Sequence, residues 1–110
     1  MRAVLGGDEG RSAVATATRY LLEELAELAP GRALEVRVPP YGATQCLPGP
    51  QHTRGTPPGV IETDPGTWIA LATGGLEWDA ALAAGRVAAS GVRADLAPLL
   101  PVMRPPAPDL

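Results

Sequence analysis

The chain of 110 residues contains no lysine and no phenylalanine, and it has one cysteine and one histidine. A single cysteine excludes an intramolecular disulfide. Cys46 and His52 together do not form a pair of ligands at the spacing typical of metal sites, so we predict no metal and no cofactor. Nine arginines stand against twelve acidic residues, for a formal net charge of −3. This balance lacks the basic surplus of nucleic-acid-binding proteins, and we predict no nucleic-acid partner.

Long apolar runs are also missing. No stretch is long and apolar enough for a membrane span or a signal peptide, which predicts no stable membrane insertion and a cytoplasmic location. The length favours one domain, which we place at 1–103, and the proline-rich stretch 104–110 is expected to be a disordered tail. No pattern indicates an oligomeric state.

The most strongly punctuated stretch of the sequence is 61–91. Asp64 is a good N-cap, Pro65 suits the first helical position, and Gly74 with Gly75 is a typical helix end, so we expect a helix between them. A second short helix is expected at about 77–84, ended by Gly85, and a strand at 86–90. Both tryptophans, Trp68 and Trp78, lie on these helices.

The remaining elements follow from periodicity. Apolar residues at three- and four-residue steps predict a helix that starts near Ser12 and ends at Pro30–Gly31. Alternation predicts strands at 33–38, 41–47 and 60–63, and the first two strands should pair as an antiparallel hairpin. Residues 48–59 should form a loop, and 94–100 a last short helix. The fold class is therefore expected to be α+β, with an antiparallel sheet of four or five strands and helices packed on one face.

An apolar ligand would have to lie between the inner face of this sheet and the helices. Burial of an acyl chain contributes roughly 0.8 kcal/mol per methylene, so such a sleeve needs no polar anchor. The alternative is that the same side chains pack on one another, as protein interiors normally do. The candidate lining residues are Leu34, Val36, Val38, Trp68, Leu71, Leu82, Val87, Leu96, Leu99 and Leu100.

The polar loop before Val60 is the only place for a ligand head group. Arg54 suits a carboxylate or phosphate, and His52 is the one side chain here of the type that serves as a switch near neutral pH, although both side chains suit a purely structural loop as well. Covalent catalysis would need His52 and Cys46 to meet, and a buried inert thiol is commoner on a strand. We therefore expect a protein that is not an enzyme and has no catalytic residues.

The order of small-residue motifs resembles a known family. The run from Trp68 to Gly74, the glycines at 85 and 91, and the pair Asp95–Leu96 are similar to the C-terminal half of the sterol carrier protein type 2 superfamily. The segments HTRGTPP (52–58) and ETDP (62–65) resemble its small actinobacterial orthologues. The resemblance covers about 12–102.

This resemblance implies a helix-covered antiparallel sheet around an apolar cavity that binds fatty acyl chains, acyl-CoA, phospholipids or sterols. It predicts non-enzymatic binding or transfer of a lipid or another apolar small molecule. The same fold also serves as an accessory domain in larger enzymes. The alternative is therefore an interaction module with a filled core, and an enzyme that acts on a small substrate at His52 and Arg54 is a third reading.

Overall fold

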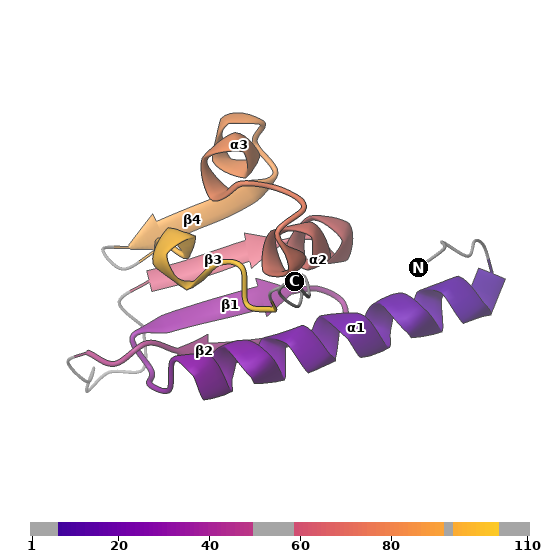
Figure 1. Cartoon of the computed structure of the whole chain (residues 1–110), viewed down its shortest axis with the longest axis horizontal. Coiled ribbons are helices and arrows are strands. Elements are labelled where there is room, and N and C mark those ends of the chain that lie inside the picture. Colours follow the sequence, from indigo (N-terminus) through magenta and orange to yellow (C-terminus); the bar gives the residue numbers. More distant parts are fainter. Residues whose placement is uncertain (1–6, 50–58, 92–93, 104–110) are drawn as a thin grey trace, which may run out of the picture.

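The computed structural model describes residues 7–49, 59–91 and 94–103, and Figure 1 shows the arrangement of the helices and strands. The elements in chain order are α1 (Gly7–Leu28), β1 (Leu34–Val38), β2 (Gly42–Cys46), β3 (Gly59–Thr63), α2 (Pro65–Thr73), α3 (Trp78–Ala83), β4 (Val87–Gly91) and the 3₁₀ turn η1 (Ala97–Leu99). An α+β architecture is thus confirmed. The short last helix predicted at 94–100 is a single 3₁₀ turn instead.

In the described part of the chain, four strands form one sheet in the order β2-β1-β3-β4. β1 and β2 form the predicted antiparallel hairpin, and β3 and β4 are also antiparallel. The two central strands, β1 and β3, are parallel. The prediction of an antiparallel sheet is therefore wrong, and the sheet is mixed.

The register explains the parallel pair. Leu34 at the start of β1 lies opposite Cys46, where β2 ends, and also opposite Gly59, where β3 begins. The chain leaves β2 and enters β3 at the same end of the sheet, so β3 must run in the direction of β1. β3 pairs with β1 and leaves β2 at the edge of the sheet. The sequence predicted a hairpin of two consecutive strands. It did not predict that the chain passes from β2 across β1, so that β3 pairs with the other edge of β1.

Helix α1 is longer than predicted. It begins at Gly7 and not near Ser12, so its 22 residues span about 33 Å, roughly twice the length of a five-residue strand. In Figure 1 the N-terminal part of α1 extends beyond the sheet.

The predicted end of α1 is confirmed by the turn that follows it. Helix α1 ends at Leu28, and Gly31 has φ +150°. A Cβ at Gly31 would overlap the main-chain carbonyl of Leu47, which itself accepts from the N–H of Ala33 at 3.0 Å. Only glycine fits this close approach between the start of β1 and the end of β2.

The predicted caps of α2 are confirmed. The carboxylate of Asp64 accepts from the backbone N–H of Thr67 at 2.7 Å and from its hydroxyl at 2.9 Å. Pro65 occupies the first turn, and Gly74 closes the helix with φ 88°. These bonds to the charged form hold the pKa of Asp64 below its usual value.

The core lies on one face of the sheet. Alternate residues of β1 and β3, among them Val36 and Ile61, are fully buried against α1 and α2. Trp68 of α2 is fully buried in the same cluster. The other face is polar: Arg37 pairs with Glu35 at 2.9 Å, and Glu62 next to it is exposed. This division places any apolar binding site on the helix-covered side.

Candidate functional site

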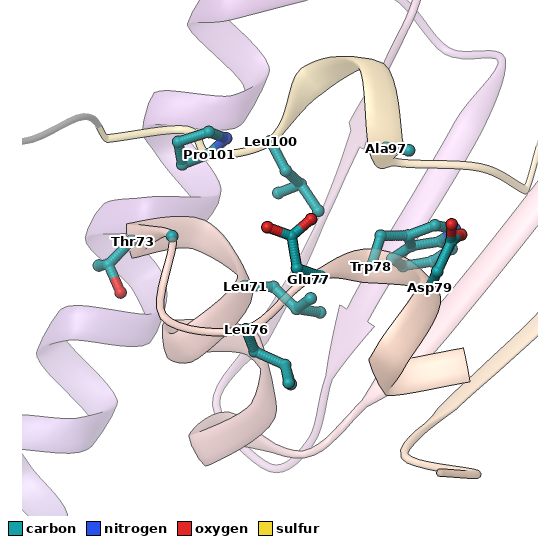
Figure 2. A pocket seen from close by; sticks show the side chains of 10 residues that line it. Leu71, Thr73, Leu76, Glu77, Trp78, Asp79, Ala97, Leu100 and Pro101 are labelled. Carbon is teal, nitrogen blue, oxygen red and sulfur yellow. The ribbon is translucent and has the colours of Figure 1, made fainter. Parts of the chain in front are cut away.

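A half-open groove of about 350 Å³ lies between the end of α2, the start of α3 and the segment around η1 (Figure 2). This volume falls within the range of small-molecule sites in proteins. Its walls combine apolar side chains with two carboxylates and one hydroxyl, and its exposed surface is nearly as polar as apolar. The lining residues are Leu71, Thr73, Gly74, Leu76, Glu77, Trp78, Asp79, Ala97, Leu100 and Pro101.

The ends of the elements position these walls. Because Gly74 turns the chain in the left-handed conformation, α2 ends and the chain returns along the groove to Trp78. On the other side, the N–H of Met103 donates to the carbonyl of Ala72 at 2.9 Å, and Leu96 is completely buried. The segment that carries Leu100 is thus held at both ends, and one wall of the groove depends on it.

Two carboxylates face this apolar surface. Glu77 is the N-cap residue of α3, but its side chain makes no capping hydrogen bond. Figure 2 shows its carboxylate directed toward the segment of Leu100 and Pro101, with Asp79 next to Trp78. Within the described residues, neither side chain has a hydrogen bond or an ion pair. The groove therefore combines apolar walls with uncompensated negative charge.

The floor of the groove belongs to the main core. Leu71 and the 6% exposed Trp78 line the groove and are also members of the buried cluster. The same cluster contains most of the residues predicted for an apolar sleeve. These are Leu34, Val36, Val38, Trp68, Leu71, Val87 and Leu96.

The other three predicted lining residues lie nearer the surface. Leu99 and Leu100 are partly buried and pack against the core, and Leu100 lines the groove. Leu82 is 41% exposed on α3 and lies outside both the core cluster and the groove lining. Among the ten predicted residues, only Leu71 and Leu100 line this groove.

A second depression lies on the other side of the η1 segment. It has a volume of about 430 Å³ and is lined by Leu28, Pro98, Leu99, Pro101 and Val102. It carries no charged side chain and shares Pro101 with the first groove. The η1 segment thus forms a wall of two neighbouring depressions.

The other chemically active residues do not add to the site. His52 and Arg54, the predicted head-group contacts, lie outside the described residues. Cys46 is completely buried in β2, and burial raises the pKa of its thiol to about 11. Among residues 7–49, 59–91 and 94–103, no group of three His, Cys, Asp or Glu side chains is arranged to hold a metal ion. No helix in the same ranges is long and apolar enough to cross a membrane.

A comparison with known protein families identifies the family of this chain. The family model described as bacterial SCP ortholog, where SCP denotes sterol carrier protein, matches residues 10–102. The chain belongs to this family. The resemblance to sterol carrier proteins seen in the sequence is thereby confirmed. No curated protein gives a significant match to this chain.

Sequence reasoning missed most of the residues that line the groove. Thr73, Leu76, Glu77, Asp79, Ala97 and Pro101 were not candidates, because they are far from one another in the sequence or have polar side chains. One signal was present. Acidic residues flank Trp78 on both sides, and an aromatic residue between two carboxylates at the start of a helix is compatible with the rim of an apolar site.

Proposed function

We propose that this protein binds a lipid or another apolar small molecule without catalysis, and that the groove beside Trp78 is where the ligand enters. The groove carries the proposal, because it is a concave surface with apolar side chains in its walls and has the size of small-molecule sites. Family membership supports a carrier role.

The apolar lining residues predicted from the sequence extend the proposed binding site from the groove into the core. Because Leu71 and Trp78 connect the groove to the core, an acyl chain bound in the groove contacts the cluster that contains Leu96 and Val36. Each methylene transferred from water contributes roughly 0.8 kcal/mol, so a chain of moderate length binds without a charged anchor. The roles of His52 and Arg54 as head-group contacts remain part of the proposal.

The test fills the groove. Ala97 is exposed and lines the groove, so Ala97→Phe occupies it without a change in the core. Ala83, exposed at the end of α3 and outside the lining, provides the matched control Ala83→Phe. Isothermal titration with decanol should show binding that Ala97→Phe weakens by about tenfold or more, which is ~1.4 kcal/mol, and that Ala83→Phe leaves unchanged.

Two results would contradict the proposal: wild-type protein that binds neither decanol nor a fluorescent phospholipid at micromolar protein, or two variants with equal affinities. The first result favours the alternative of an interaction module. That alternative is supported by the dense packing of the core, where Leu34, Val36 and Trp68 are completely buried.

A further inference from the structure

Residues 97–103, called the strap below, lie between the two depressions and are weakly attached to the rest of the described chain. We propose, resting on the function proposed above, that the strap swings about Leu96, lifts to admit the ligand to the groove beside Trp78, and then closes against the ligand. The proposal rests on the anchor of the strap, its few attachments and the space on both of its sides.

Leu96 is the fixed end of the strap. Its side chain is completely buried in the core cluster, and it directly precedes the 3₁₀ turn η1. Beyond it, no side chain of the strap is fully buried, since three of the seven are exposed and four are partly buried. Rotation at Leu96 therefore moves the strap and leaves the core closed.

The backbone of the strap has few attachments. Within the described chain, one hydrogen bond joins it to a helix or strand, from the N–H of Met103 to the carbonyl of Ala72 in α2 at 2.9 Å. Its other N–H bonds are local and end on acceptors in residues 95–97. Segments with few buried contacts and few backbone hydrogen bonds open locally at a fraction of the free energy of global unfolding.

Both sides of the strap face a depression. Leu100 and Pro101 lie at the groove beside Trp78 (Figure 2), whereas Leu99 and Val102 line the second depression. The strap therefore contacts the core with only part of its apolar surface, and lifting it exposes little that is buried. Because the strap is a wall of both depressions, its opening joins them and widens the entrance to the groove.

The first test uses the wild-type protein. Chymotrypsin cleaves after Leu99 only when the strap has left the core surface, so the cleavage rate reports the population of the open state. Under native conditions, cleavage after Leu99 should be faster than cleavage after the completely buried Leu25, and mass spectrometry of the fragments measures both. Decanol at about ten times its Kd should slow cleavage after Leu99 roughly tenfold, because the ligand stabilises the closed state.

A matched pair of variants links the opening of the strap to ligand entry. Val102→Ala removes two half-buried methyl groups from the strap. It should therefore raise both the cleavage rate and the association rate of decanol about fourfold, since both rates follow the open population. Val60→Ala makes the same change at a half-buried position on the polar face of the sheet and should leave both rates unchanged. Stopped-flow fluorescence measures the association, with Trp78 in the groove as the reporter.

The outcomes separate the two proposals. If decanol binds but does not slow cleavage, or if cleavage after Leu99 is as slow as cleavage after Leu25, the strap does not gate the groove and the binding function stands. The same conclusion follows if Val102→Ala speeds cleavage without speeding association, or if Val60→Ala has an equal effect. If decanol does not bind to the wild type, both proposals fail.

Discussion

The indole Nε1 of Trp68 donates to the main-chain carbonyl oxygen of Thr18 at 3.2 Å and so joins α2 to α1 across 50 positions of sequence. Both residues are completely buried. The bond satisfies the one polar atom of the largest side chain in the core, which otherwise lies among aliphatic residues. It therefore holds the two helices in one relative position above the sheet.

Replacement of Trp68 by Phe should lower the free energy of unfolding by about 2–3 kcal/mol, because it removes this hydrogen bond and leaves a cavity in the core. Trp78→Phe is the matched control. Its side chain lies at the groove, so the loss should be about 1 kcal/mol. Urea unfolding followed by far-ultraviolet circular dichroism measures both. Equal losses would show that Trp68 has no special role.

The hydroxyl of Thr18 leads to an opposite prediction. It is buried and has no hydrogen-bond partner in the structure, whereas the hydroxyl of the equally buried Thr67 donates to Asp64 at 2.9 Å. Thr18→Val should be neutral or stabilise the fold by up to ~1 kcal/mol, because it removes an unpaired polar group without a change in shape.

Thr67→Val is the internal control for that experiment, and it should destabilise the fold by about 1 kcal/mol. Valine and threonine have similar helix propensities, so the two substitutions differ mainly in the hydrogen bond. The melting temperatures of both variants, compared with that of the wild type, test this prediction. A lower melting temperature for Thr18→Val would refute the assignment.

The N-cap of α2 predicts a pH dependence of stability. The folded pKa of Asp64 lies below its unfolded value, mainly because its carboxylate accepts from the N–H of Thr67. The stabilisation is therefore present above the unfolded pKa, about 4, and is lost as the pH falls through the folded pKa.

Asp64→Ala should accordingly reduce the free energy of unfolding by about 1 kcal/mol at pH 7, and the difference from wild type should shrink in acid. Asp79→Ala has no side-chain hydrogen bond to lose within the described residues and should show a smaller effect with no such trend. Urea titrations at neutral and acidic pH test this. A difference that is constant with pH would argue against the capping role.

Two glycines with positive φ should respond differently to alanine. Gly31→Ala places a methyl group on the carbonyl of Leu47 and should cost more than about 3 kcal/mol, because main chain and not a flexible side chain must move. Gly85, φ +72°, has nothing within 4 Å of the added carbon, so Gly85→Ala should cost only about 1 kcal/mol of backbone strain. Similar melting temperatures for the two variants would contradict this account.

Local features of the fold were predictable from the sequence because they depend on neighbouring residues. The caps at Asp64 and Gly74, the break after α1 and the hairpin of β1 and β2 involve contacts within a few positions, and each is confirmed. The start of α1 was placed five residues late, because Ser12 is a possible cap that the helix does not use.

The candidate site was only partly predictable. Leu71 and Leu100 were named for their apolar character and do line the groove. Glu77 and Asp79 were not named, because a charged residue at the start of a short helix is usually a solvated one. Whether such a side chain turns toward solvent or across a groove depends on the position of the η1 segment more than ten residues away.

The sequence by itself determined the fold class, the family and most helix and strand positions, since these follow from periodicity, caps and the order of short motifs. The tertiary structure alone decided that β1 and β3 pair in parallel, because the chain leaves β2 and enters β3 at the same end of the sheet and β3 lies beside β1 instead of β2. It also brought Glu77 and Asp79 beside Leu71 and Leu100. No local sequence pattern predicts this contact, because the groove is formed by the ends of two helices together with a segment that follows the last strand.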